Sequence, residues 1–277
     1  MKKFGLIGHP IAHSLSPALF NAAFGGKYTY DLIEESDFNK AYDRFMEEYD
    51  AINITAPFKE KAYRKADTIS KECQAIGAAN ILTKGNNCIL AANSDIVGVT
   101  GSLGRNGINR NSDGTALIVG CGGAAMAAAY AMWEVLDHET FIVNRNVEKA
   151  RAFATNMKEV TGRDSRLHVS GLESFCELFP MADVVIYTLP IAIPEIERLC
   201  CPRIKGVHSR TKRQAILEAN YKDPAFTHEV MEKMRRINPE LTFISGKEWL
   251  LYQAVGAYGF FTSDKPDIEA MRIVIER

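Results

Sequence analysis

A glycine-rich turn near the middle of the chain could hold the phosphates of a dinucleotide. Gly120, Gly122, Gly123 and Ala124 follow the apolar run 115–119 and lead into an alanine-rich stretch. Glycine lets the backbone approach a pyrophosphate closely, and a helix N-terminus offers unpaired N–H groups with a partial positive charge. A strand, a glycine turn and a helix in this order therefore predict a dinucleotide-phosphate site. The alternative is that the glycines serve only a tight contact between helix and strand.

The residues after the next predicted strand favour one of the two nicotinamide dinucleotides. That strand, 139–143, ends at Asn144, which lies 24 residues after Gly120 (144 − 120). An NAD site usually places an acid about 20 residues beyond the glycines, where it binds the ribose 2′-hydroxyl. This chain has Arg145 there, and Lys149 follows one helical turn later. Because a cation suits a 2′-phosphate, the pattern predicts NADP rather than NAD, unless Arg145 is simply a solvated surface residue.

The N-terminal part of the chain carries polar residues that could bind a small acid. Ser14 and Ser16 lie directly before Pro17 and a predicted helix. Two hydroxyls near a helix N-terminus can hold a carboxylate between them, although Ser16 could equally serve as a plain helix cap. Lys59 follows the predicted strand 51–54, and ligands of parallel α/β sheets bind beyond the carboxyl ends of strands. Lys59 is thus expected near a ligand; the alternative is an ordinary surface lysine.

A predicted hairpin is flanked by further polar residues. Its strands are 81–83 and 88–91, Asn80 precedes them, and Asp95 follows them within the sequence Asn-Ser-Asp. Such a sequence at the end of an apolar strand is typical of a turn or a helix cap. On its own, therefore, Asp95 does not indicate a function.

The alternation of strands and helices predicts an α/β protein with two domains. A chain of 277 residues is long enough for both, and alternating elements form mostly parallel sheets flanked by helices. We expect a substrate-binding and catalytic domain in 1–103 and a Rossmann-type, doubly wound NADP-binding domain in 104–245. The final segment, 246–277, contains two predicted helices that could cover the N-terminal sheet, so we assign it to the first domain. Predicted strands are 4–8, 28–33, 51–54, 81–83, 88–91, 115–119, 139–143, 182–187 and 215–218, and predicted helices include 18–24, 38–49, 58–66, 96–103, 248–261 and 268–275.

The composition excludes several classes of protein. Hydrophobic residues make up 47% and charged residues 24%, as in soluble globular proteins, and a net charge of −1 gives no general affinity for nucleic acid or an anionic membrane. The six cysteines form no C-x-x-C pair and no zinc-ligand pattern, so we expect no metal site, reduced thiols and a cytoplasmic location. No run is long enough for a signal peptide or a membrane span. The sequence leaves both a monomer and a homodimer open.

Taken together, these segments resemble the shikimate dehydrogenase family, in order and through nearly the whole chain. The resemblance covers a substrate loop, a catalytic lysine motif, asparagine and aspartate motifs, NADP motifs and the glutamine of a closing helix. The corresponding segments are 8–17, 53–59 (Asn-Ile-Thr-Ala-Pro-Phe-Lys), 76–80, 93–98, 120–125, Asn144-Arg145 and Gln253-Ala254.

The resemblance implies a reversible, NADPH-dependent reduction of 3-dehydroshikimate to shikimate, in aromatic amino-acid biosynthesis. It implies that Lys59 and Asp95 flank the oxygen that changes between ketone and alcohol. Hydride delivery builds negative charge on that oxygen, and a protonated lysine can stabilise the charge and donate the proton. The other implied contacts are Ser14, Ser16 and Tyr221 to the substrate carboxylate, Thr55, Asn80 and Gln253 to ring hydroxyls, and Gly120, Gly122, Gly123, Ala124, Asn144, Arg145 and Lys149 to NADP.

Departures from the family pattern lie mainly on the cofactor side. Tyr187 begins a segment that only loosely resembles the family's Asn-Ala-Thr-Pro, and Trp249 stands where a methionine often touches the nicotinamide. Segment 218–224 is a modified form of the usual Asp-x-x-Tyr-Asn-Pro. A quinate/shikimate dehydrogenase of broader specificity, another two-domain dehydrogenase such as one acting on a folate, and a non-catalytic NADP-binding ligand-sensing module therefore stay open. The basic loop 205–213 is either solvated or helps to hold the NADP phosphate.

Overall fold

The computed structural model describes residues 2–200 and 213–276 and divides the chain into two units. Unit 1 comprises Met1–Val99 and Leu250–Arg277, and unit 2 comprises Thr100–Trp249. The borders fall within helices α5 (Asp95–Arg105) and α11 (Gly246–Phe261). Each border lies four residues from the one expected from the sequence (103 − 99 and 250 − 246). What each unit binds stays a prediction at this point.

Unit 1 is built on a six-stranded mixed sheet with the order β2-β1-β3-β5-β6-β4. Strand β1 runs parallel to β2 and β3, and β4 runs parallel to β6, whereas β5 is antiparallel to both of its neighbours and forms the predicted hairpin with β6. Strands β3 and β6 therefore point the same way, and their carboxyl ends lie at one edge. The strands are β1 (Lys3–Gly8), β2 (Thr29–Glu34), β3 (Ala51–Ile54), β4 (Thr68–Ile69), β5 (Ile81–Lys84) and β6 (Ile89–Ala92).

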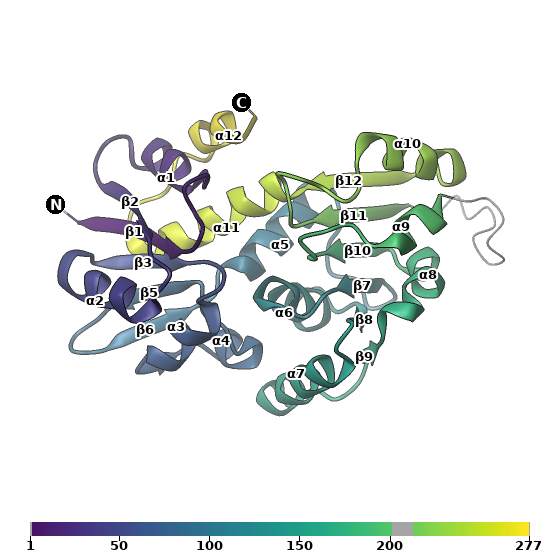
Figure 1. The fold of residues 1–277 in the computed structure, drawn as a ribbon, viewed down its shortest axis with the longest axis horizontal. Coiled ribbons are helices and arrows are strands. Elements are labelled where there is room, and N and C mark those ends of the chain that lie inside the picture. Colours follow the sequence, from purple (N-terminus) through teal and green to yellow (C-terminus); the bar gives the residue numbers. More distant parts are fainter. Residues whose placement is uncertain (1, 201–212, 277) are drawn as a thin grey trace. The chain divides into compact units, whose positions relative to one another are not determined.

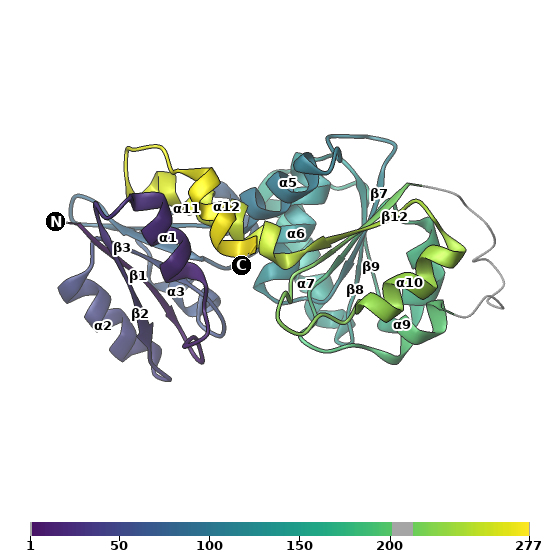
Figure 2. The ribbon, with the colours of Figure 1, turned by 90° about the horizontal axis from the view of Figure 1, so that it is seen from above.

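Two hydrophobic cores hold unit 1 together, one on each face of its sheet. Helices α1 (Ser16–Phe24), α11 and α12 (Ile268–Glu276) pack on one face (Figures 1 and 2). Within this core, Phe20 stacks on Tyr30 with ring centroids 4.3 Å apart. The opposite face is covered by helices α2 (Phe38–Glu48), α3 (Lys59–Lys65) and α4 (Lys71–Ile76). Burying one such aromatic or aliphatic side chain contributes about 1.5–3 kcal/mol, so the C-terminal helices are an integral part of this unit.

Unit 2 contains an all-parallel sheet with the order β12-β11-β10-β7-β8-β9. Counted from β7, this is the strand order 3-2-1-4-5-6 of a doubly wound Rossmann fold, which confirms the predicted fold class. Helices α6 (Gly123–Tyr130) and α7 (Val147–Thr161) lie on one face, and α9 (Pro194–Leu199) and α10 (His228–Ile237) lie on the other (Figure 2). The remaining elements are β7 (Thr115–Val119), β8 (Glu139–Val143), β9 (Leu167–Ser170), β10 (Val184–Tyr187), β11 (Gln214–Glu218), β12 (Leu241–Ser245) and α8 (Phe175–Leu178).

None of the helices in the described part of the chain combines the length and the apolar character that a membrane crossing requires.

Several elements of unit 2 were not expected from the sequence, namely β9, β12 and helices α8, α9 and α10. Strand β12 in particular lies at the edge of the sheet and pairs with β11 alone.

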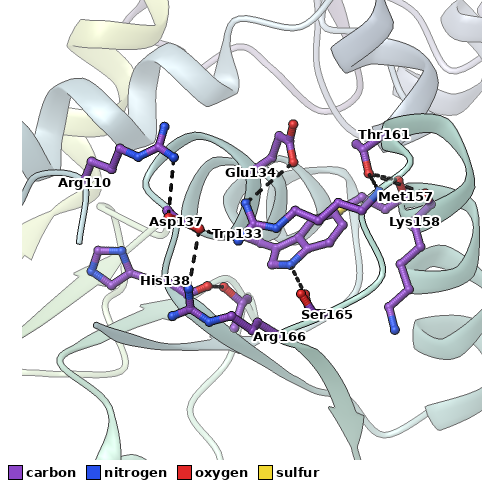
Figure 3. Close-up of polar contacts among 12 residues, drawn as sticks. Arg110, Trp133, Glu134, Asp137, His138, Met157, Lys158, Thr161, Ser165 and Arg166 are labelled. Carbon is purple, nitrogen blue, oxygen red and sulfur yellow. Dashed lines mark hydrogen bonds and ion pairs between the residues drawn. The ribbon is translucent and has the colours of Figure 1, made fainter. Parts of the chain in front are cut away.

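The carboxylate of Asp137, at the amino edge of the unit 2 sheet, interacts with three arginines. Helix α6 continues into a π-helical turn, Ala131–Val135, and Asp137 follows with a left-handed φ of 60°. Its carboxylate lies 3.4 Å from the guanidinium of Arg110 and 3.5 Å from that of Arg166, and it accepts a hydrogen bond from Arg163 (Figure 3). Asp137 thereby ties the end of this helix to the segments that precede β7 and β9.

Replacing Asp137 by asparagine tests this attachment, because asparagine tolerates the left-handed backbone equally well. The Arg163 guanidinium, helped by its neighbours, holds the pKa of Asp137 below its ordinary value. A lowered carboxyl pKa stabilises the fold above the unfolded-state pKa, and the gain is lost as the pH falls through the folded-state pKa. Asp137→Asn should therefore lower Tm at pH 7. The difference in Tm between wild type and variant should become smaller below a pH of about 3.9.

Calorimetric scans of wild type and variant, at pH 7 and at a pH below about 3.9, check this expectation. Asp164→Asn is the matched control, since the Asp164 side chain is 94% exposed and its pairing with Lys158 should contribute little. Equal Tm values for wild type and Asp137→Asn at pH 7 would contradict the role given to Asp137.

Candidate active site

Lys59 and Asp95 form a largely buried ion pair at the carboxyl edge of the unit 1 sheet. Lys59 is the first residue of α3, which follows β3, and Asp95 is the first residue of α5, which follows β6. Lys59 Nζ donates a hydrogen bond to Asp95 Oδ2, and the two side chains are 17% and 7% exposed. Lys59 is therefore not an ordinary surface lysine. The pair presents an oriented ammonium group that can hold and move a proton.

A buried hydrogen-bond network fixes the start of α5 next to Lys59. Asn93 Oδ1 accepts a bond of 2.9 Å from the backbone N–H of Asp95, which confirms the turn expected at this position. Asn80 Oδ1 accepts from the backbone N–H of Ser94 at 2.8 Å, and Asn80 Nδ2 donates to Ser94 Oγ at 3.2 Å. The carbonyl of Lys59 accepts from the residue before Asn80, Ala79, at 3.0 Å. Asn80, predicted to bind a ring hydroxyl, is thus held rigidly beside the ion pair.

Ser14 and Ser16 form a hydroxyl pair at the start of α1. Ser14 Oγ donates to Ser16 Oγ at 3.2 Å, and the backbone N–H of Ser16 donates to Ser14 Oγ at the same distance. The alternative that Ser16 merely caps the helix is wrong, because Leu15 occupies the N-cap position and Ser16 is already the first helical residue. Ser14 Oγ therefore accepts from the first backbone N–H of α1, and each hydroxyl keeps its own O–H group as a donor.

The loop that carries the serines lies against the loop that carries Thr55. The backbone N–H of Thr55 donates to Ile7 O at 2.9 Å, and that of His9 donates to Ala56 O at 3.2 Å. A Cβ added to Gly8 would lie 2.4 Å from Thr55 Cγ2, so only glycine permits this approach. Strands β1 and β3 therefore deliver the serine pair and Thr55 to the same edge.

Gln253 reaches this unit through helix α11. Gly256, three residues later, packs so closely that an added Cβ would lie 2.9 Å from Val97 Cβ and 3.2 Å from Ser94 Cβ. Helix α11 therefore passes directly against the start of α5, and Gln253 is half-buried one turn away. Its predicted contact with a ring hydroxyl stays a prediction.

The glycine turn of unit 2 has the geometry that a phosphate cradle needs. Gly120 directly follows β7 with a φ of 116°, and an added Cβ would lie 2.5 Å from Thr188 Oγ1. Helix α6 begins at Gly123 with Gly122 as its N-cap, and no side chain caps it. The N–H groups of its first turn, including that of Ala124, are therefore available to an anion. The donors present at this edge thus fit a dinucleotide pyrophosphate.

The residues after β8 lie at the same carboxyl edge of the parallel sheet. Asn144 Nδ2 donates to Asn146 O at 2.9 Å, and Asn146 caps α7 by accepting from the backbone N–H of Lys149 at 3.0 Å. Arg145 and Lys149 are both exposed. Asn144 and Asn146 thus fix the turn that carries Arg145 and leads to Lys149. This turn follows β8, which is the neighbour of β7 in the sheet.

Two further features singled out from the sequence are Tyr221 and the basic loop 205–213. Tyr221 is half-buried in the segment after β11 of unit 2, and its contact with substrate stays a prediction. Residues 205–212 of the basic loop lie outside the described residues. Arg213 lies directly before β11, where its Nη2 donates to Asn106 O at 2.7 Å. That is the amino edge of the sheet, opposite to Gly120, so Arg213 does not help to hold the phosphate.

Sequence reasoning missed two of the residues that shape the site, Ser94 and Tyr30. Ser94 is 1% exposed and bonds Asn80 through both its backbone and its hydroxyl. Tyr30 of β2 donates to Asn53 Oδ1 of β3 at 2.8 Å. The position of Ser94 between Asn93 and Asp95 could have indicated its role, whereas nothing in the sequence around Tyr30 did.

The Rossmann unit and the separate ammonium–carboxylate site define a class, the dinucleotide-dependent oxidoreductases of two-domain α/β build. Residues 6–82 match the family model of the shikimate dehydrogenase substrate binding domain. The shikimate dehydrogenase (NADP(+)) of Methanocaldococcus jannaschii is 30% identical over 285 residues, which cover 99% of this chain and 96% of the relative. The chain therefore belongs to the shikimate dehydrogenase family.

Solved structures agree with this assignment. The crystal structure of a shikimate dehydrogenase in complex with NADP⁺ has a TM-score of 0.81 and 28% identity, covering 100% of this chain and 95% of that one. The shikimate 5-dehydrogenase of Thermus thermophilus, in complex with NADP(H) and shikimate, has a TM-score of 0.78 and 25% identity, with coverages of 100% and 99%. The similarity thus extends over both units.

Proposed function

We propose that this chain catalyses the reversible, NADPH-dependent reduction of 3-dehydroshikimate to shikimate. The observation that carries the proposal is the buried Lys59–Asp95 pair at the carboxyl edge of unit 1, beside Asn80. Three relatives that align over 99% of this chain and 96% of their own length are named shikimate dehydrogenase (NADP(+)), which supports the same activity.

The chemistry follows from the charges that the pair can supply. When bound, NADPH supplies a hydride to the ketone carbon, which leaves negative charge on the oxygen. Lys59 Nζ stabilises that charge and donates its proton to the oxygen, and Asp95 orients the ammonium group by accepting its hydrogen bond. In the reverse direction the neutral Lys59 amine accepts the alcohol proton.

The substrate carboxylate fits the paired serines. Ser14 Oγ and Ser16 Oγ lie 3.2 Å apart, so each hydroxyl can turn to donate to one carboxylate oxygen. Thr55, Asn80 and Gln253 offer hydroxyl and amide groups to the ring hydroxyls from the same unit. We therefore assign substrate binding to unit 1 and NADP binding to unit 2.

We propose two sets of cofactor contacts, one to the pyrophosphate and one to the 2′-phosphate. The pyrophosphate is held by backbone N–H groups of Gly122, Gly123 and Ala124, with Gly120 permitting the approach, and the 2′-phosphate by Asn144, Arg145 and Lys149. The five cysteines in the described residues that form no disulfide, together with the net charge of −1, support a cytoplasmic enzyme that acts on a small molecule and has no nucleic-acid partner.

Replacing Lys59 by alanine tests the proposed proton donor. The turnover number kcat for shikimate oxidation should fall by about 10²–10⁴-fold, the range typical of losing a general acid–base group. Formation of NADPH, followed by its absorbance, measures the effect. Lys61→Ala is the matched control, because Lys61 is exposed on the same helix and should retain near-normal turnover. Near-normal turnover in Lys59→Ala would remove the central role of this residue.

Replacing Arg145 by alanine tests the proposed 2′-phosphate contact. The dissociation constant for NADP⁺ should rise about tenfold or more, as expected for the loss of one charge-assisted contact, while that for NAD⁺ should not change. Calorimetric titration measures both constants. Arg151→Ala, in which an exposed arginine of the following helix α7 loses its pairing with Glu148, should change neither. Equal losses of the two cofactors in Arg145→Ala would show that the 2′-phosphate lies elsewhere.

A further inference from the structure

A polar contact lies inside the apolar core of unit 1, and none of the steps above uses it. The Tyr30 hydroxyl donates to Asn53 Oδ1 at 2.8 Å, and the two residues are 4% and 3% exposed. Tyr30 belongs to β2 and Asn53 to β3, and β1 lies between these strands. The tyrosine side chain therefore crosses β1 to reach Asn53. Removing the hydroxyl would leave the Asn53 oxygen unsatisfied away from water, which is costly.

Aromatic contacts fix the place of the Tyr30 hydroxyl. The ring stacks on Phe20 of α1 with an interplanar angle of 6°, and the ring of Phe261 in α11 lies 6.5 Å away, centroid to centroid. Phe20 lies one helical turn after Ser16. Burial raises the pKa of Tyr30 well above its ordinary value, and the nearby Ser16 hydroxyl acts in the opposite direction. The hydroxyl therefore keeps its proton and is a donor at a fixed place in the core.

The amide of Asn53 has one orientation that satisfies both of its neighbours. Its Nδ2 donates to Asn80 O at 3.2 Å, and a backbone carbonyl can only accept. Asn53 Oδ1 must then face the Tyr30 hydroxyl, which supplies the proton of that bond. Without the hydroxyl the amide could turn over in search of a donor, and Nδ2 would leave the Asn80 carbonyl. The hydrogen bonds thus run in one direction, from Tyr30 through Asn53 to Asn80.

Asn80 connects Asn53 to the start of α5. Its carbonyl accepts from the backbone N–H of Ile54 at 2.8 Å as well as from Asn53. Its side chain bonds both the backbone N–H and the hydroxyl of Ser94, directly before α5. All of these residues belong to unit 1. The orientation of the Asn80 peptide, and with it the place of the Asn80 amide, therefore depends on a bond that Tyr30 keeps in position.

We propose that Tyr30 is a positioning residue, whose hydroxyl strengthens substrate binding by holding Asn53 and, through it, Asn80. The inference rests on the proposed function, in which the Asn80 amide binds a hydroxyl group of the substrate ring. The backbone of Asp95 is held separately by Asn93. Loss of the Tyr30 hydroxyl should therefore weaken the binding of the ring and leave proton transfer and NADP⁺ binding unchanged.

Steady-state kinetics and shikimate titration of Tyr30→Phe test the proposal, because phenylalanine keeps the ring and removes only the hydroxyl. The shikimate KM and dissociation constant should rise about tenfold, as expected when a buried acceptor loses its donor. The turnover number kcat and the KM for NADP⁺ should stay near the wild-type values. Tyr49→Phe is the matched control, since Tyr49 is 2% exposed in the core of the opposite face and its hydroxyl donates to Asp31 at 3.3 Å. This control also loses one tyrosine hydroxyl and should leave the shikimate KM unchanged.

A double variant shows whether Tyr30 acts through Asn80. Asn80→Ala removes the amide that would contact the ring, and it keeps the backbone carbonyl to which Asn53 donates. If Tyr30 works by placing that amide, Tyr30→Phe should raise the shikimate KM no further in the Asn80→Ala background. Effects that multiply in the double variant would overturn the proposal.

Three other results would contradict the positioning role. They are an unchanged shikimate KM in Tyr30→Phe, an equal rise of the KM values for shikimate and NADP⁺, and the same rise of the shikimate KM in Tyr49→Phe. If Tyr30→Phe does not fold, Asn53→Leu replaces it, and an unchanged dissociation constant for shikimate there overturns the proposal. Absence of turnover in the wild type would overturn the proposed function, and titration would still test Tyr30. Absence of shikimate binding would overturn both.

Discussion

The ion pair between Lys59 and Asp95 places two charges where neither could be buried alone. Removing one partner of such a pair typically costs about 3–5 kcal/mol, because the other charge is left without compensation. The sheet of unit 1 meets this constraint through β5, which runs antiparallel between β3 and β6 and so brings their carboxyl ends to one edge. Asn80, Asn93 and Ser94 then fix the backbone at both charges. The geometry of the ion pair is therefore a consequence of strand direction as much as of side-chain choice.

Unit 2 follows a different constraint, the close approach of backbone segments at the carboxyl edge of its parallel sheet. Gly120 leaves no room for a side chain against Thr188, and Gly246 leaves none against the carbonyl of Ala219. The departures from the family pattern gather here, yet the structure gives two of them a defined place. Tyr187 is fully buried and bonded to the following segment, and Glu218 closes the loop 219–224 by accepting the backbone N–H of Ala225. Tyr187 and Glu218 end strands β10 and β11, and the glycine turn follows β7 at the same carboxyl edge of the sheet.

Much of the fold could be predicted from the sequence because most strands are short apolar runs bounded by turn residues. The run before Gly120 and the hairpin around 81–91 are examples, and the structure confirms both. Strand β12 was missed because it is an edge strand with a mixed pattern of burial. The side-chain hydrogen bonds of Ser94, Tyr30 and Glu218 could not be foreseen, since each depends on a partner brought close only by folding. The sequence also could not show whether Ser16 caps a helix. Ser16 is not the cap because helix α1 begins at Ser16 itself, with Leu15 at the N-cap position.

The most direct test of the Lys59–Asp95 pair as a shikimate-oxidising site is the initial rate of reduced-cofactor formation by the wild-type protein. Four mixtures are compared, shikimate or quinate combined with NADP⁺ or NAD⁺. We expect turnover with shikimate and NADP⁺, at a kcat/KM above that of the other three mixtures. A higher kcat/KM with quinate would contradict the assigned substrate. No turnover in any mixture, with NADP⁺ binding shown by titration, would contradict catalysis itself and leave a ligand-sensing protein.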